Sequence, residues 1–277
     1  MSLNRLRDLA AADKAAIGTF VSMGNMSEVE CLGYTGLDFV IIDTEHGPFD
    51  TETMMNLIRA AELVHLVPVV RLANVDHKDI QRAADCGAQA IILPCLRELD
   101  EFKKAVSLAK YAPLGQRGFI KGRGTSFGNA PWAATETLEE YYANSNERLL
   151  VMPQCETKEA LEQIEDIVQI EGLDGIFVGP YDLSTGLGIP GQFDNPIFKQ
   201  ALDRTLNACH DAGKLCYIFT GTTDQARDYI AQGYDGITHN LDFNILSEAY
   251  KQVVTDIRKS GRKETIDSVF KRRNEGS

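Results

Sequence analysis

The sequence has no uninterrupted apolar run that approaches the ~20 residues of a membrane-spanning helix. Residues 1–13 are charged and mixed, without the apolar core of a secretory signal. The six cysteines form no CxxC pair and the five histidines form no HExxH pattern, which argues against zinc ladders and zinc-protease sites. We therefore expect a cytoplasmic protein with six free thiols and no membrane partner.

Positive charge is in deficit. The 277 residues include 28 Lys+Arg and 40 Asp+Glu, which gives a formal net charge of −12. Binding to a phosphate backbone needs a basic face, so this deficit argues against nucleic acid as a partner. There is no Walker A pattern, and Gly122-Arg123-Gly124 does not follow a strand and open a helix, so we expect no dinucleotide site. Small anions need only a local positive site and stay open as ligands.

The sequence does contain short apolar, β-branched runs that alternate with amphipathic stretches of helical spacing, such as 50–63 and 195–212. Eight runs are predicted as strands: 17–21, 39–43, 68–72, 90–94, 149–152, 175–178, 215–220 and 236–239. Eight nearly continuous apolar strands with intervening helices predict a single-domain α/β fold, a (β/α)8 TIM barrel. An open doubly wound sheet is the alternative.

Two segments depart from this alternation. Residues 111–148 form a long, glycine-rich insertion after the fourth predicted strand, which is typical of a lid or a subunit contact. The residues after Ser260 are polar and locally basic, as in a frayed, solvated end. We therefore predict a barrel domain over residues 1–260 and a polar C-terminal tail over residues 261–277.

Polar side chains stand where several predicted strands end. Asp43 and His46 close the second strand, Arg71 lies in the third, Glu156 follows the fifth and Asp182 follows the sixth. In a barrel the carboxyl ends of all strands meet at the face that carries the active site. Each residue alone has an ordinary role open to it, such as a helix cap, a rim ion pair or a first-turn carboxylate. Their joint position favours a shared site.

This combination suits metal-assisted chemistry on a 2-oxo acid. Two carboxylates with water match a hard divalent cation, Mg²⁺ or Mn²⁺, and leave positions open for the carboxylate and keto oxygens of the substrate. Arg71 would supply positive charge as an enolate forms. His46, oriented by Asp43, would shuttle a proton near pH 7. A Schiff-base aldolase would need a lysine inside the barrel, and none of the eight predicted strands contains one.

The sequence also resembles a known family. Four spaced motifs are similar to those of the metal-dependent class II pyruvate aldolases of the HpcH/HpaI family: Ile41-Ile42-Asp43-Thr44-Glu45-His46-Gly47-Pro48, Pro68-Val69-Val70-Arg71, Gln154-Cys155-Glu156-Thr157 and Val178-Gly179-Pro180-Tyr181-Asp182-Leu183-Ser184. The likeness runs in order from about residue 4 to residue 258. It again implies a (β/α)8 barrel.

The resemblance also implies roles for the site residues. A divalent metal (Mg²⁺, Mn²⁺ or Co²⁺) would be held by Glu156 and Asp182. Arg71 would contact the keto or enolate oxygen, and His46, paired with Asp43, would activate a metal-bound water. The remaining implied contacts are Gln154 beside the substrate, the turn of Gly179, Pro180, Tyr181 and Asp182 around the pyruvyl carboxylate, and Asp85 in the polar network near His46.

The activity implied is that of a lyase, the reversible cleavage of a 4-hydroxy-2-oxo acid to pyruvate, or a related 2-oxo acid, plus an aldehyde. The resemblance implies a homo-oligomer, often a hexamer, whose subunits exchange a C-terminal helix. Tyr181 stands where the family usually has a small residue, which leaves the aldehyde open. Two alternatives remain: a carbon–carbon lyase acting on CoA thioesters, of the citrate or malyl-CoA lyase type, and a non-catalytic barrel that binds a 2-oxo acid.

Overall fold

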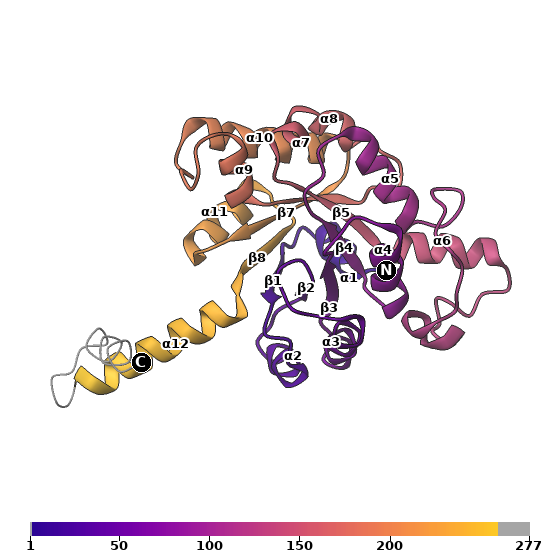
Figure 1. Ribbon diagram of the computed structural model, residues 1–277, viewed down its shortest axis with the longest axis horizontal. Helices are drawn as coiled ribbons and strands as arrows, with labels where there is room; N and C mark the ends of the chain where they lie inside the picture. The colour runs from indigo at the N-terminus through magenta and orange to yellow at the C-terminus, as the bar shows by residue number, and fades with distance from the viewer. Residues whose placement is uncertain (1, 260–277) are drawn as a thin grey trace. The chain divides into compact units, whose positions relative to one another are not determined.

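The computed structural model describes residues 2–259 and shows a closed barrel of parallel strands in which each strand pairs with the next along the chain (Figure 1). The strands are β1 Ala16–Val21, β2 Phe39–Asp43, β3 Val67–Arg71, β4 Ala90–Leu93, β5 Leu150–Cys155, β6 Gly175–Val178, β7 Leu215–Thr220 and β8 Gly236–Leu241. The predicted (β/α)8 barrel is confirmed, and the doubly wound alternative is wrong.

The largest error in strand bounds concerns β5, which was expected to end at Met152 and continues to Cys155. The hydrophobic run ends at Met152, but Gln154 still pairs with Phe177 of β6. Strand side chains alternate between the barrel interior and the surrounding helices. Cys155 packs outward against Thr205, at 3.7 Å, so Gln154 is directed into the barrel.

The helices that connect successive strands lie around the barrel (Figure 1). The helices of the described residues are α1 Arg5–Ala11, α2 Met26–Leu32, α3 Thr51–Leu63, α4 His77–Cys86, α5 Leu99–Ala109, η1 Arg123–Gly128, α6 Leu138–Arg148, α7 Lys158–Glu162, α8 Ile164–Ile167, α9 Pro180–Gly186, α10 Pro196–Asp211, α11 Thr223–Gln232 and α12 Asp242–Lys259. Asp50, Asp76 and Thr222 cap the starts of α3, α4 and α11 with their side chains. The helical stretch between β5 and β6 is divided at Gln163 into α7 and α8.

Aromatic rings fill one layer of the barrel interior. The rings of Phe39 and Tyr217 lie 5.7 Å apart between their centroids. They leave no room for side chains on two neighbouring strands, because a Cβ on Gly236 would lie 2.0 Å from Tyr217 and one on Gly18 would lie 2.4 Å from Phe39. A second apolar layer packs between the outer faces of the strands and the helices. The barrel is therefore a filled core.

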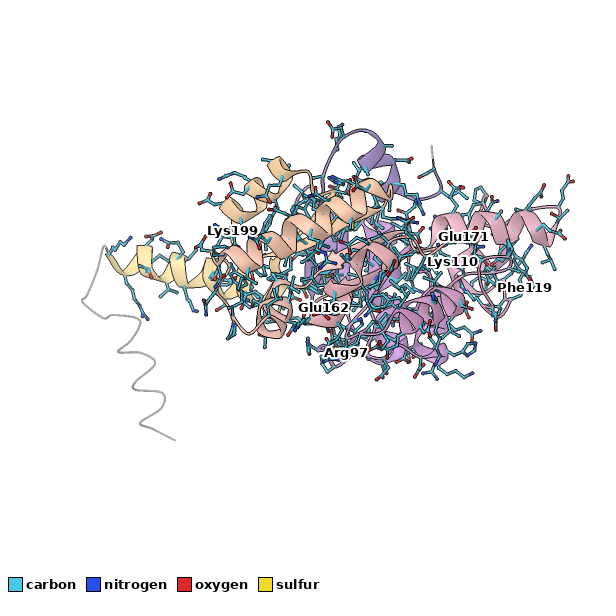
Figure 2. All side chains as sticks on the ribbon, turned by 90° about the horizontal axis from the view of Figure 1, so that it is seen from above. Arg97, Lys110, Phe119, Glu162, Glu171 and Lys199 are labelled. Atoms are coloured by element: carbon cyan, nitrogen blue, oxygen red, sulfur yellow. The ribbon has the colours of Figure 1, made fainter. Side chains whose placement is uncertain are left out.

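A buried lysine fixes the base of the barrel, where the strands begin. Lys110 follows α5, and its Nζ donates to the carbonyl oxygens of Asn146 and Leu149, at 2.7 and 2.5 Å, and to Oδ2 of Asp174, at 2.7 Å. Arg97 precedes the same helix and stands well apart from Lys110 in Figure 2. Helix α5 thus runs from the mouth of the barrel, where the strands end, to its base.

The chain divides into two compact units after Asn240, so α12 is considered by itself. Of its exposed apolar residues, five recur at intervals of three and four positions: Phe243, Leu246, Tyr250, Val253 and Ile257. The predicted tail, 261–277, and its boundary lie outside the described residues. Within residues 2–259, no helix is long and apolar enough to cross a membrane.

Candidate active site

Asp43 and Arg71 meet at the mouth of the barrel because they are register partners at the ends of β2 and β3. The Arg71 guanidinium donates from Nε to Oδ1 of Asp43, at 2.9 Å, and from Nη2 to Oδ2, at 2.6 Å. It also lies over the ring of Phe20, 4.5 Å from the centroid. Two hydrogen bonds and one aromatic face hold this cation in a fixed position.

The loop after β2 brings Glu45 and His46 to the same place. Oδ1 of Asp43 accepts hydrogen bonds from the backbone N–H groups of both residues, at 3.1 and 3.3 Å. Oε2 of Glu45 lies 3.1 Å from Nη1 of Arg71 and 3.9 Å from Nε2 of His46. His46 is thus bonded to Asp43 through its backbone N–H. Asp43 is committed to Arg71 and to the loop backbone, and Glu45 is the carboxylate beside the imidazole.

Glu45 sits in an environment of mixed charge. Burial raises the pKa of its carboxyl group, and the positive charges of Arg71 and His46 oppose that shift. The nearby carboxylates of Asp43 and Asp182 raise the same pKa further. Glu45 is thus a half-buried acid in contact with a fixed cation and an exposed imidazole, although the sequence analysis gave it no role.

Glu156 stands at the end of β5 and is almost fully buried. Its Oε1 accepts the backbone N–H of Cys95 at 2.6 Å, and its Oε2 accepts a short hydrogen bond from Nε2 of Gln154. Cys95 lies two residues after the end of β4 and has a positive φ of 62°. Among the described residues, Oε1 of Gln154 has no hydrogen-bond partner. A buried acceptor is thus left beside Glu156.

Negative charge accumulates around Glu156. Burial raises the pKa of its carboxyl group, the Cys95 N–H lowers it, and the carboxylates of Asp182 and Glu45 raise it again. Glu156 and Asp182 line one cavity of about 480 Å³ at the barrel mouth. A divalent cation would offset this repulsion, and carboxylate oxygens are its preferred donors. The donor set therefore fits the implied metal.

No group of three or more His, Cys, Asp or Glu side chains within residues 2–259 is arranged to hold a metal ion. The predicted site uses only two protein ligands, so water and substrate would complete the coordination sphere.

The turn after β6 carries the remaining predicted residues. Gly179 has no room for a side chain, since a Cβ would lie 2.9 Å from Oε2 of Glu156. Pro180 then begins α9, where the missing N–H of proline costs no helical hydrogen bond. Tyr181 and Asp182 follow in the first turn. The close approach of Gly179 to Glu156 brings both predicted metal ligands to one side of the mouth.

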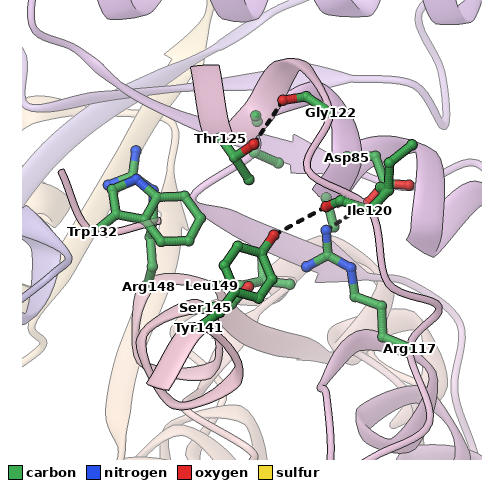
Figure 3. Close-up of a pocket in the computed structure, with 14 residues that line it drawn as sticks. Asp85, Arg117, Ile120, Gly122, Thr125, Trp132, Tyr141, Ser145, Arg148 and Leu149 are labelled. Atoms are coloured by element: carbon green, nitrogen blue, oxygen red, sulfur yellow. Dashed lines mark hydrogen bonds and ion pairs between the residues drawn. The ribbon is translucent and has the colours of Figure 1, made fainter. Parts of the chain in front are cut away.

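Asp85 is the one predicted site residue that the structure does not bring to the others within a single chain. Helix α4 runs back from the mouth and ends at Cys86, shortly before β4 begins. Oδ1 of Asp85 accepts a hydrogen bond of 2.7 Å from Nη2 of Arg117, and Figure 3 shows the pair beside Ile120 and Tyr141. The cavity it lines also includes Leu149, next to the start of β5. Asp85 thus ties the insertion to the base.

Sequence reasoning missed three contributors at the mouth: Phe20, Glu45 and Cys95. Glu45 lies inside the quoted second-strand motif, so its position offered a signal. Cys95 follows Pro94 at a strand end, but its role depends on the backbone N–H and not on the thiol. Burial and the neighbouring carboxylates raise the pKa of that thiol to about 11, so it stays protonated.

Known proteins are similar to this chain over most of its length. The family model for HpcH/HpaI aldolase/citrate lyase matches residues 16–249. A 4-hydroxy-2-oxo-heptane-1,7-dioate aldolase from Salmonella dublin is 29% identical over 244 residues, which cover 88% of this chain and 90% of that protein.

Two solved structures show the same architecture. A HpcH/HpaI aldolase/citrate lyase family protein from Burkholderia cenocepacia J2315 is 32% identical, with a TM-score of 0.83, over 92% of this chain and 99% of that one. The citrate synthase SbnG is 28% identical, with a TM-score of 0.82, over 93% and 98%. The chain is an aldolase or lyase of the HpcH/HpaI type and belongs to the HpcH/HpaI aldolase/citrate lyase family.

Proposed function

We propose that the protein is a divalent-metal-dependent aldolase that cleaves a 4-hydroxy-2-oxo acid reversibly to pyruvate, or a related 2-oxo acid, and an aldehyde. The observation that carries this proposal is the placement of Arg71, fixed by Asp43, on the same mouth as the Glu156 and Asp182 carboxylates. The guanidinium of Arg71 and a metal at the two carboxylates would together stabilise a substrate oxygen that gains negative charge during the reaction.

Glu156 and Asp182 would hold the metal. When bound, it would supply Lewis-acid polarisation of the carbonyl group of the substrate. Gln154 supports this assignment, because its amide N–H holds one oxygen of Glu156 and its own Oε1 remains free to accept a proton donor of the substrate or of water. The backbone between Gly179 and Asp182 would face the substrate carboxylate.

His46 and Arg71 would have separate roles in the bond cleavage. The C4 hydroxyl gives up its proton through water to His46, whose imidazole is exposed to the cavity and lies next to Glu45. The electron pair of the C3–C4 bond moves toward C2, and the aldehyde departs. Arg71 stabilises the negative charge that collects on the C2 oxygen, and C3 takes up a proton to give the 2-oxo acid.

The direct test is formation of pyruvate from 4-hydroxy-2-oxoheptanedioate, the substrate that the relatives' name indicates, with added Mg²⁺ or Mn²⁺. We expect turnover by the wild type and its loss in the Arg71→Ala and Glu156→Ala variants. Full activity in both variants would refute the proposal.

The similarity to a citrate synthase favours a second candidate, carbon–carbon chemistry on a CoA thioester. This alternative predicts turnover that requires CoA thioesters and is absent with free oxo acids. A non-catalytic barrel would bind pyruvate and metal but would not exchange the methyl protons of pyruvate. Steady-state assays with both substrate classes, together with proton exchange, separate the three cases.

We also propose that the chain forms a homo-oligomer through α12. The exposed residues Phe243, Leu246, Tyr250, Val253 and Ile257 follow the three–four spacing of a seam that packs against another helix. Light scattering of a Leu246→Glu/Val253→Glu variant should show smaller particles than the wild type. Particles of unchanged mass would exclude this helix as the contact.

A further inference from the structure

A row of aromatic rings runs from Arg71 along one side of the barrel mouth. Phe20 lies beneath the guanidinium, Phe219 lies 6.0 Å from Phe20 and Tyr181 lies 6.0 Å from Phe219, between ring centroids. The three residues come from β1, β7 and α9, so three separate segments build one surface. We call Phe20, Phe219 and Tyr181 the aromatic row.

Tyr181 is the exposed end of the aromatic row. Its side chain is 55% exposed, whereas Phe20 is 4% exposed. The ring is nevertheless held in place, because Phe193 packs edge-on behind it with centroids 5.0 Å apart. The Tyr181 hydroxyl lies 3.6 Å from the position that a Cβ on Gly221 would take, so it rests against the loop after β7. The Tyr181 ring is therefore held in place while one part of it stays exposed, which makes it a preformed apolar surface next to Asp182.

The charges on the other side of the mouth oppose an additional anion. The cavity there is lined by four carboxylates and two cations: Glu45, Glu156, Glu159, Asp182, Arg97 and Lys158. Arg97 is already paired with Glu159 at 2.9 Å, and Lys158 is paired with Glu162 at 3.5 Å. Arg97, Lys158 and a bound divalent cation would together bring these four negative charges only to neutrality. An aldehyde with a terminal carboxylate would meet no surplus positive charge on this side.

We propose that Tyr181 selects the aldehyde, and that this chain favours an aldehyde with an aromatic body over one with a terminal carboxylate. The inference rests on the proposed aldolase function. The oxo-acid oxygen would lie at Arg71 and the carboxylate at the backbone of the Gly179–Asp182 turn, so the rings of the aromatic row would be left to contact the carbon chain beyond C3. An aromatic body gains edge-to-face contacts with these rings, and it adds no charge to the acidic side.

The test is the addition of pyruvate to two aldehydes, benzaldehyde and succinic semialdehyde, in the presence of Mn²⁺. The measured quantity is the ratio of their kcat/KM values within each protein, so any general loss of active enzyme cancels. We expect a ratio above one for the wild type, a ratio about tenfold lower for Tyr181→Ala, and a ratio near that of the wild type for Tyr181→Phe. Tyr34→Ala is the matched control, because Tyr34 is 86% exposed and lies after α2, away from the aromatic row.

Two outcomes would overturn the inference. One is a wild-type ratio below one, and the other is a ratio in Tyr181→Ala within twofold of the wild type. Exchange of the pyruvate methyl protons by the wild type separates these results from failure of the proposed function. Exchange with an unselective ratio rejects only the role of Tyr181, whereas absence of both exchange and addition rejects both proposals.

Discussion

Arg71 stands directly across from Asp43 in the β2–β3 register, and two hydrogen bonds of 2.9 and 2.6 Å join their side chains. Asp43 is fully buried, so the pair lies in surroundings where such contacts are stronger than in water. The consequence is a guanidinium whose position is set before any substrate arrives. Its remaining nitrogen, Nη1, lies 3.1 Å from Oε2 of Glu45.

Replacing the guanidinium of Arg71 by an ammonium group should reduce activity even though the positive charge is kept. We expect Arg71→Lys to lower the rate of pyruvate proton exchange by about 10²-fold, because an ammonium group cannot reproduce two parallel hydrogen bonds to Asp43. Arg204→Lys is the matched control, since Arg204 makes the same two-bond contact with Glu165 on the outer surface, at 2.7 Å for each bond. Equal rates in the two variants would show that the geometry at Arg71 has no catalytic value.

Glu156 should control metal binding. Titration with Mn²⁺, followed by the electron paramagnetic resonance signal of the free ion, should give one site per chain in the wild type. We expect Glu156→Gln to weaken that site at least about tenfold, since a neutral amide is a poorer ligand for a hard cation. Glu162→Gln, at an exposed carboxylate of α7, should bind like the wild type. A Glu156→Gln variant with undiminished affinity would remove Glu156 from the metal site.

Acid should inactivate the enzyme above the ordinary glutamate range. Burial raises the pKa of Glu45 above 4.5, so its carboxyl group gains a proton earlier as the pH falls and loses its attraction to Arg71 and His46. The proton-exchange rate should therefore decline with a midpoint above pH 4.5. Glu45→Gln mimics the protonated form, and its profile should be lower and flatter on the acid side. An acid limb that is identical in that variant would assign the titration to another group.

Lys110 should matter for stability and not for chemistry. Its side chain is 1% exposed, and its ammonium group donates to Asp174 and to two carbonyl oxygens. We expect Lys110→Met to lower the free energy of unfolding by about 3–5 kcal/mol, because the carboxylate and both carbonyl groups lose a buried partner. Urea unfolding followed by circular dichroism measures the change. Lys103→Met, at an exposed position of α5, should leave the midpoint unchanged.

The barrel could be predicted because each strand is a short apolar run, which can be recognised in the sequence without knowledge of tertiary contacts. Asp43, Arg71, Glu156 and Asp182 could be placed on one face for a related reason, since order along the chain fixes which end of each strand they occupy. The partners of these residues could not be predicted. Whether Asp43 meets Arg71 or His46 depends on the β2–β3 register and on the path of the following loop.

Two further features depend on contacts that are distant in the sequence. Cys95, whose N–H binds Glu156, has a positive φ, a conformation that a cysteine seldom adopts and that its neighbours in the sequence do not predict. Asp85 was assigned by resemblance alone, and the orientation of α4 takes it to the base, where it meets Arg117. Local patterns locate strand ends, whereas tertiary contacts decide which side chains meet.

We propose above all that the site formed by Arg71, Glu156 and Asp182 generates an enolate from a 2-oxo acid. The most direct measurement is deuterium exchange of the pyruvate methyl protons in D₂O, followed by proton NMR, with Mg²⁺ or Mn²⁺, with EDTA, and with the Arg71→Ala variant. It requires no choice of aldehyde. We predict exchange that depends on the metal and is lost in the variant. Absence of exchange with every divalent metal tested, or exchange that persists in Arg71→Ala, would contradict the account.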